Sequence, residues 1–267
     1  MESLKPPRLL VIAGSDSSGG AGLQADLKTA QAFGVYAQTA VTAVTVQDTG
    51  KVYSVNPVAP EIVRGQIEAA LNDIGADAIK IGMLGNGEIA RTVADALEGS
   101  DIPLVLDTVL LSSSGTPLLD AAGMDILKTR LIPRAILVTP NLPEAEALTG
   151  ILPDAEHQLR NAAMAFKLLG SKAVLFKGGH ADTERVHDVL WSGEEFMTFE
   201  APRQHTRHTH GTGCTLASAI ACGLAQKLPL KDAVARAHGY VQGAIRTAPG
   251  LGQAAGPLNH QFLPQKP

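Results

Sequence analysis

The chain has few cysteines, few aromatic residues and few charged residues for its length of 267. Two cysteines cannot build a disulfide framework, and the low content of aromatic (4%) and charged (18%) residues leaves a chain rich in small aliphatic side chains. No apolar run approaches the roughly 18 residues of a membrane span, and we expect no signal peptide. The formal net charge of −4 and a pI near 6.1 argue against a general nucleic-acid binder, which needs a basic surface.

The two cysteines, Cys214 and Cys222, lie eight residues apart in one predicted helix. Eight helical residues rise about 12 Å, whereas a disulfide needs Cα atoms roughly 4.4–6.8 Å apart. We therefore expect two free thiols, which indicates a reducing compartment and favours the cytoplasm.

The hydrophobic pattern alternates between strands and helices along nearly the whole chain. Predicted strands cover residues 9–13, 35–46, 78–81, 104–106, 136–138 and 172–176. Predicted helices cover residues 21–33, 60–73, 88–97, 123–131, 144–148, 156–169, 213–226 and 230–247. This alternation predicts an α/β fold with a parallel sheet.

Two segments depart from the alternation of strands and helices. Residues 51–55 are expected to form a small β flap on the preceding strand, and residues 186–199 are expected to form a β-hairpin. No linker or repeat is apparent, so we expect one domain over residues 1–267, with the last ~20 residues a polar tail.

The strongest local signal is the run from His208 to Thr215, HTHGTGCT, directly before an apolar helix. Gly211 and Gly213 allow backbone N–H groups to converge, and a helix N-terminus adds unpaired donors and partial positive charge. This arrangement predicts an anion site, most often occupied by phosphate. The same position is expected to lower the pKa of the Cys214 thiol. The alternative is a tight turn followed by a small buried cysteine.

Further polar residues follow the ends of predicted strands, which is the ligand-binding edge of an open α/β sheet. The Gly/Ser-rich loop 13–22 is neither a dinucleotide-binding nor a Walker motif, and Asp26 lies in the helix after it. Other strand-end residues are Asp107, Asn141, Glu144, and Lys177 in the run KGGH that ends at His180. Taken alone, the loop 13–22 is as consistent with an ordinary surface loop as with a ligand site. Asn141 and Glu144, taken alone, are equally consistent with local helix caps.

Three histidines, His205, His208 and His210, precede the glycine loop. They lack partner thiolates and an H-E-x-x-H pattern, so a polar approach to the loop is favoured over a structural zinc site.

Six motifs stand in order along the chain: AGSDSSGGAGLQADLKT (13–29), KIGML (80–84), LDTV (106–109), TPNLPEAEAL (139–148), KGGH (177–180) and THGTGCTL (209–216). Together they resemble the hydroxymethylpyrimidine/phosphomethylpyrimidine kinase family of thiamin synthesis. The resemblance implies a ribokinase-like fold, often dimeric, with helices on both faces of a mainly parallel sheet. It also implies that ATP phosphorylates 4-amino-5-hydroxymethyl-2-methylpyrimidine to the monophosphate and then to the diphosphate.

The resemblance further implies roles for individual residues. The residues that match the family's pyrimidine pocket are Gly14, Asp26, Gln47 and Met83. Cys214 matches the base near the substrate hydroxyl, and the N–H groups of Gly211, Thr212 and Gly213 stabilise charge on the transferred phosphoryl group. The residues that match the Mg-ATP side are Asp107, Asn141 and Glu144, acting on Mg²⁺ through water, and Lys177 near the phosphates.

Three other functions remain open from the sequence. A pyridoxal kinase of the same fold also takes a planar heteroaromatic alcohol, and certain pyridoxal kinases share a cysteine where most sugar kinases have Asp. A non-catalytic pyrimidine sensor would keep the pocket and lose the base. A cysteine hydrolase would use Cys214 as its nucleophile, but this chain does not offer His and Asp residues in a natural order along the sequence to act as the partners of that nucleophile.

Overall fold

The computed structural model describes residues 5–112, 115, 117–179, 184–193 and 195–263. His180, the last residue of the KGGH motif, lies outside them. The strands in chain order are β1 (Arg8–Ser15), β2 (Tyr36–Gln47), β3 (Val52–Pro57), β4 (Ala78–Ile81), β5 (Leu104–Leu106), β6 (Leu137–Val138), β7 (Ala173–Phe176), β8 (Arg185–Ser192) and β9 (Glu195–Pro202). The helices are α1 (Gly22–Ala32), α2 (Pro60–Asn72), α3 (Gly87–Ala96), α4 (Ala121–Ile126), the π-helical turn η1 (Leu127–Leu131), α5 (Ile132–Arg134), α6 (Leu142–Thr149), α7 (Glu156–Leu168), α8 (Thr212–Ala225) and α9 (Leu230–Arg246).

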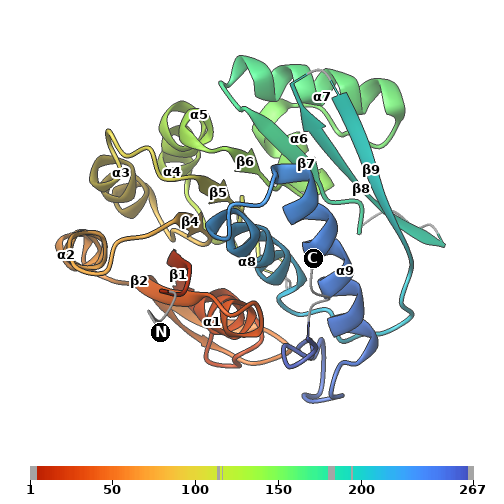
Figure 1. The fold of residues 1–267 in the computed structure, drawn as a ribbon, viewed down its shortest axis with the longest axis horizontal. Coiled ribbons are helices and arrows are strands. Elements are labelled where there is room, and N and C mark those ends of the chain that lie inside the picture. Colours follow the sequence, from red (N-terminus) through yellow and green to blue (C-terminus); the bar gives the residue numbers. More distant parts are fainter. Residues whose placement is uncertain (1–4, 113–114, 116, 180–183, 194, 264–267) are drawn as a thin grey trace.

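The nine strands found in the described residues form one sheet in the order β3-β2-β1-β4-β5-β6-β7-β8-β9 (Figure 1). Six neighbouring strands of the sheet run parallel, in the order β2, β1, β4, β5, β6 and β7. Strand β3 pairs antiparallel with β2, and the β8–β9 hairpin pairs antiparallel with β7. The predicted α/β class, the small flap at β3 and the hairpin are therefore confirmed. Because parallel strands point the same way, the loops after β1, β4, β5, β6 and β7 meet at one edge.

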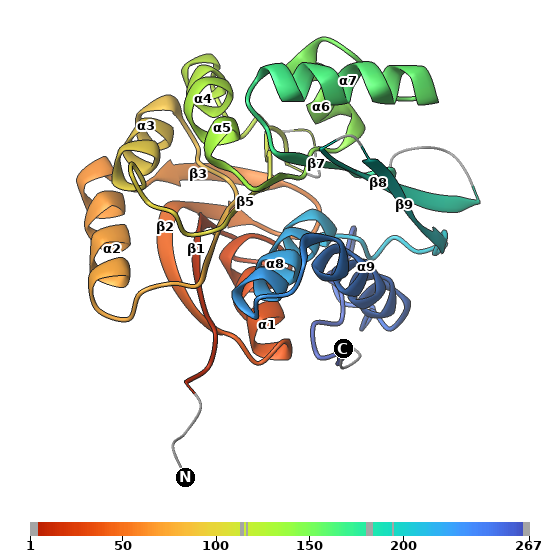
Figure 2. The same cartoon turned by 45° about the horizontal axis from the view of Figure 1, so that its top comes forward.

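The sheet separates two apolar cores, since successive side chains of a strand point to opposite faces. On β1, Leu9 and Val11 pack with α1, α8 and α9, while Leu10 and Ile12 pack with the helices from α2 to α7. Figure 2 shows the two helix groups on opposite sides of the sheet. Helices on both faces were predicted, and α8 is the central helix of its layer: eleven of its residues are buried.

One predicted helix differs from the structure. The helix expected over 123–131 begins at Ala121 and changes at Leu127 into the π-helical turn η1, followed by the short α5. Pro133 has no N–H to continue a regular ladder of helical hydrogen bonds, which accounts for the irregular end.

The C-terminal segment, expected as a polar tail, packs against the fold as far as it is described. Leu258 and His260 are buried, and the ring of Phe262 lies 6.2 Å from that of Tyr240. The backbone N–H of His210 donates to the carbonyl of Gly256. The segment thereby supports the loop that enters α8. Among the described residues, no helix has both the length and the apolar character to cross a bilayer.

Candidate active site

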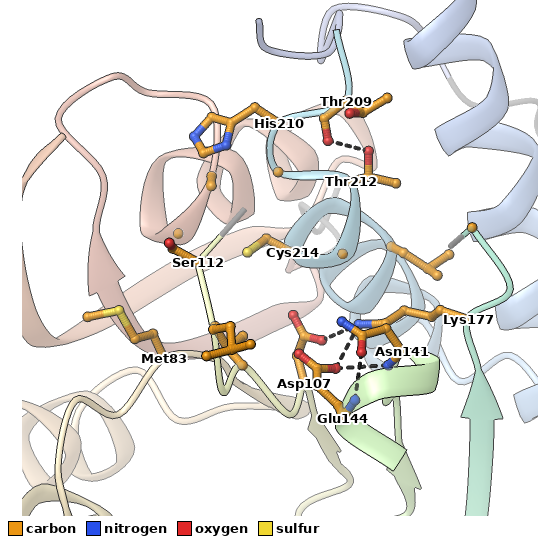
Figure 3. Close-up of a pocket in the computed structure, with 18 of the residues that line it drawn as sticks. Met83, Asp107, Ser112, Asn141, Glu144, Lys177, Thr209, His210, Thr212 and Cys214 are labelled. Carbon is orange, nitrogen blue, oxygen red and sulfur yellow. Dashed lines mark hydrogen bonds and ion pairs between the residues drawn. The ribbon is translucent and has the colours of Figure 1, made fainter. Parts of the chain in front are cut away.

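A cavity of about 930 Å³ opens at the carboxyl edge of the parallel strands. Eleven of the twelve predicted site residues line it: Gly14, Gln47, Met83, Asp107, Asn141, Glu144, Lys177, Gly211, Thr212, Gly213 and Cys214. In Figure 3, Cys214 at the start of α8 lies between Met83 on one side and the cluster around Asp107 and Lys177 on the other. The convergence of the strand-end residues on one edge is as predicted.

Asp26 is the exception among the predicted site residues. Its carboxylate is fully buried below the cavity, where it accepts hydrogen bonds from Lys80 Nζ at 2.9 and 3.0 Å and from Ser218 Oγ at 2.6 Å. It does not line the cavity. The structure therefore places Asp26 in the core and outside the cavity wall where the pyrimidine was expected, because α1 directs this side chain toward Lys80 on β4 and Ser218 on α8.

The loop before α8 has the backbone geometry that the predicted anion site requires. Gly211 has φ +82°, and a Cβ atom there would lie 1.8 Å from the carbonyl oxygen of Gly20, so only glycine fits. No side chain caps this helix N-terminus. The Thr212 N–H, which was expected among the donors, already donates to the carbonyl of Thr209 in the turn that enters α8. Within the described part of the chain, the backbone N–H groups of Gly213 and Cys214 have no hydrogen-bond acceptor. These donors and the helix dipole favour an anion in the cavity.

The Cys214 thiol differs from its predicted state. Burial raises its pKa to about 11, and the nearby Lys80 ammonium only partly opposes that rise. The helix N-terminus alone would lower the pKa, but enclosure between the sheet and the loop 13–22 outweighs it. Cys214 is therefore a neutral thiol near pH 7 in the unliganded protein. Both cysteines are free, as predicted.

A cluster of two carboxylates and one ammonium group occupies the side of the cavity next to α6. Lys177 Nζ lies 2.9 Å from Asp107 Oδ1 and 3.8 Å from Glu144 Oε2. Although burial alone would raise the pKa of Asp107, Lys177 and Lys80 hold it below its usual value. Burial raises the pKa of Glu144 despite its closeness to Lys177.

Asn141 and Glu144 cap α6 and line the cavity at the same time. The Asn141 side chain accepts from the Glu144 N–H, and the Glu144 carboxylate accepts from the Asn141 N–H, each at 2.8 Å. The capping interpretation of these residues is therefore correct. Their position at the start of a helix also aims them at the strand edge.

The opposite side of the cavity holds the residues expected to recognise the pyrimidine. Gly14 lets the Met83 side chain pack closely against the loop after β1, because a Cβ atom at position 14 would lie 2.8 Å from Cε of Met83. The Gln47 amide is only weakly held: its Oε1 accepts from Thr45 at 3.3 Å, and its Nε2 lies 3.4 Å from His210 Nε2. An amide with such long contacts can exchange them for hydrogen bonds to a ligand.

Asp16 and His210 form a pair that the sequence did not indicate. Asp16 Oδ2 lies 2.9 Å from His210 Nε2 across 194 positions of sequence, and it also accepts from the N–H groups of Gly20 and Ala21. The pair ties the loop after β1 to the anion loop. Each residue belongs to a motif noted in the sequence, but no local signal pairs them.

This pair makes stability depend on pH. Burial alone would raise the pKa of Asp16, yet the hydrogen bonds from His210, Ser18 and Ala21 lower it from 3.8 to about 2. A lowered folded-state pKa gives stability that is complete above pH 3.8 and is lost as the pH falls toward 2.

We expect Asp16→Asn to reduce the free energy of unfolding by about 1–3 kcal/mol at pH 7 and progressively less below pH 4. Urea unfolding at pH 7, 5, 4 and 3 measures this, with the exposed Asp125→Asn as control. A constant difference at all pH values would contradict the assignment.

The comparisons with known proteins agree with this arrangement. A model of the phosphomethylpyrimidine kinase family matches residues 16–259. The hydroxymethylpyrimidine/phosphomethylpyrimidine kinase of Streptomyces coelicolor is 46% identical over 255 residues, which cover 96% of this chain and 94% of that protein. The ADP complex of Bacillus subtilis pyridoxal kinase superposes with a TM-score of 0.89 at 34% identity, over 97% of this chain and 99% of that one. The phosphomethylpyrimidine kinase of Clostridium difficile 630 gives a TM-score of 0.79 at 39% identity, over 90% and 100% of the two chains.

Proposed function

The chain belongs to the phosphomethylpyrimidine kinase family, and from that premise we propose how its cavity carries out two successive phosphorylations. The chain is an ATP-dependent hydroxymethylpyrimidine/phosphomethylpyrimidine kinase of thiamine biosynthesis. The observation that carries this assignment is the order of groups along the cavity in Figure 3: the pyrimidine pocket at Met83, then the Cys214 thiol, then the cluster at Lys177. An alcohol bound in the pocket faces a phosphate bound at the anion loop.

In the first reaction the substrate hydroxyl oxygen attacks the γ-phosphorus of ATP, and the bond to the β–γ bridging oxygen breaks to release ADP. The hydroxyl proton passes to the sulfur of Cys214 in its thiolate form. The N–H groups of Gly213 and Cys214 stabilise charge on the phosphoryl oxygens, and Lys177 supports the same charge from the other side. In the second reaction a phosphate oxygen of the monophosphate is the nucleophile, and it is already ionised near neutral pH.

The cluster fits a magnesium ion that retains water ligands. Asp107 Oδ1 accepts from Lys177 and Thr139, while its Oδ2 has no such partner among the described residues and lies toward Gly213. No group of three or more His, Cys, Asp or Glu side chains gathers in the described ranges to cage a metal. Mg²⁺ needs only one or two carboxylates beside phosphates and keeps much of its water shell, so Asp107, Asn141 and Glu144 would hold it through water. When bound, it neutralises charge on the transferred phosphoryl group.

The decisive experiment is incubation of the purified chain with ATP, Mg²⁺ and 4-amino-5-hydroxymethyl-2-methylpyrimidine, followed by phosphorus NMR. Sequential appearance of monophosphate and diphosphate is the expected result. No ATP consumption with this alcohol would instead favour the non-catalytic sensor.

Gln47 is assigned to recognition of the pyrimidine. We expect Gln47→Leu to weaken pyrimidine binding by about 1–3 kcal/mol and to leave ATP binding unchanged, because leucine fills similar space but leaves ligand polar atoms unpaired. Calorimetry with each ligand measures this. Gln38→Leu is the matched control: it lies on the same strand, and its amide donates to Gly75 away from the cavity. Equal losses for both ligands would refute the assignment.

Pyridoxal is the second candidate substrate, and the structural similarity to Bacillus subtilis pyridoxal kinase favours testing it. Both compounds are planar heteroaromatic rings with a hydroxymethyl group. Comparison of kcat/KM for the two alcohols decides the preference, and we expect the pyrimidine to be the better substrate.

The wider setting is also part of the proposal. A homodimer is supported by exposed apolar side chains on β2 and β3, with Val44, Val46 and Tyr53 each at least half exposed (50, 54 and 57%). The single sheet supports one kinase domain, and two free thiols support a cytoplasmic enzyme. Light scattering of the purified chain tests the dimer.

A further inference from the structure

A buried ion pair lies directly beneath the cavity and has no role in the mechanism above. Lys80 on β4 and Asp26 on α1 are both fully buried, and both carboxylate oxygens of Asp26 contact Lys80 Nζ, at 2.9 and 3.0 Å. Ser218 on α8, also fully buried, donates to the same carboxylate at 2.6 Å. Three elements that are distant in sequence therefore hold one ammonium group in place.

This ammonium group lies near enough to Cys214 for the two groups to interact electrostatically. Ser218 follows Cys214 by four residues in α8, so the two side chains lie on one helix face, one turn apart. Lys80 also lines the same cavity as Cys214, whereas Asp26 does not. Lys80 Nζ lies so close to Gly82 that a Cβ atom there would be 2.7 Å away. The ammonium is thus fixed between its carboxylate below and the cavity above.

Stability of the fold does not account for such a pair. Removing two charges from water costs free energy that their attraction only partly returns, and well-packed apolar residues in the same place often stabilise a protein as much. A charge held in the core next to a reacting group is more readily explained by its effect on that group.

We propose that the Lys80 ammonium, held by Asp26 and Ser218, is the positioning charge that stabilises the thiolate of Cys214. The inference rests on the proposed function for its catalytic consequence. The thiol first loses its proton to water, the substrate hydroxyl then gives its proton to the sulfur as the bond to phosphorus forms, and the sulfur returns that proton to solvent. Lys80 stays protonated throughout and touches no substrate atom.

Other charged groups near Cys214 act in both directions. Asp26 on α1 and Asp107 after β5 raise the pKa of the thiol, whereas the N–H of Gly22, which donates to the sulfur, lowers it. Lys177 after β7 also interacts with the sulfur across the cavity. Although burial alone would lower the pKa of Lys80, Asp26 above all raises it beyond its ordinary value, so Lys80 remains a cation.

The test is alkylation of Cys214 by iodoacetamide, measured by mass spectrometry of the Cys214 peptide between pH 7 and 10. Only the thiolate reacts, so the rate reports its fraction without any need for kinase activity. The double variant Lys80→Met/Asp26→Asn removes both charges and keeps an acceptor for Ser218. We expect its alkylation rate to fall roughly tenfold at a given pH, as for a rise of one pKa unit.

Lys172→Met is the matched control. It removes one lysine just before β7, at the end of that strand away from the cavity, and it should leave the alkylation rate unchanged. Equal alkylation rates in the wild type and the folded double variant would overturn the proposal. Circular dichroism shows whether the double variant folds.

A measurement on the wild type keeps the proposal testable if the double variant does not fold. When two groups interact, each senses the ionisation of the other. The ¹⁵Nζ resonance of Lys80 should therefore shift at the pH where Cys214 ionises, and this step should be missing in Cys214→Ala. A Lys80 resonance that does not move while Cys214 titrates would overturn the inference. An inactive chain that still shows both effects would refute the kinase assignment and leave the placement of the charge intact.

Discussion

Replacing Cys214 with alanine is expected to slow the first phosphorylation by roughly 10²–10⁴-fold and the second much less. The first substrate is an alcohol whose proton must leave, whereas the second is a phosphate that needs no base near neutral pH. The backbone donors at Gly213 and at position 214 remain in the variant, so phosphate binding should persist. Single-turnover rates for each step, wild type against variant, measure the difference.

The raised pKa of Cys214 adds a signature to this result. With a pKa of about 11, roughly one thiol in 10⁴ is ionised at pH 7. The first step of the wild type should therefore accelerate close to tenfold per pH unit above pH 7.5, while the second step and the Cys214→Ala variant should not. Cys222→Ala is the matched control, since that thiol is fully buried in the core. An equal fall in both steps would mean that Cys214 shapes the site without acting as a base.

Replacing Lys177 with methionine is expected to slow both phosphorylations by roughly 10²–10³-fold, as for the loss of one charged donor to a transferring group. Methionine keeps the length of the side chain but removes the cation that Asp107 and Glu144 share. Two neighbouring carboxylates then repel each other and any incoming phosphate. Steady-state kcat for each step measures the effect.

The pattern across the two steps separates Lys177 from Cys214. If kcat falls only for the first phosphorylation, Lys177 acts together with the base on the substrate hydroxyl. If kcat falls less than tenfold in both steps, Lys177 does not act on the transferred phosphoryl group. Lys172→Met is again the control, at the other end of β7. Lys177→Arg should recover part of the rate, because it restores the charge with a different geometry.

Local patterns in the sequence were sufficient for the class of fold and the edge that carries the site. Alternating strand and helix periods predicted a parallel sheet, and parallel strands bring Asp107, Asn141 and Lys177 to one edge without further information. The glycines at 211 and 213 predicted an anion loop because the conformation they allow is a local property of the backbone.

The tertiary structure alone decided the charge states and the partners. The pKa of Cys214 rises because burial by distant elements outweighs the helix N-terminus. Asp26 points into the core because Lys80 and Ser218 lie opposite it there. The pairing of Asp16 with His210 spans 194 positions. Desolvation and Coulomb interactions depend on distances in space between segments far apart in the chain, and residue spacing in a sequence does not contain those distances.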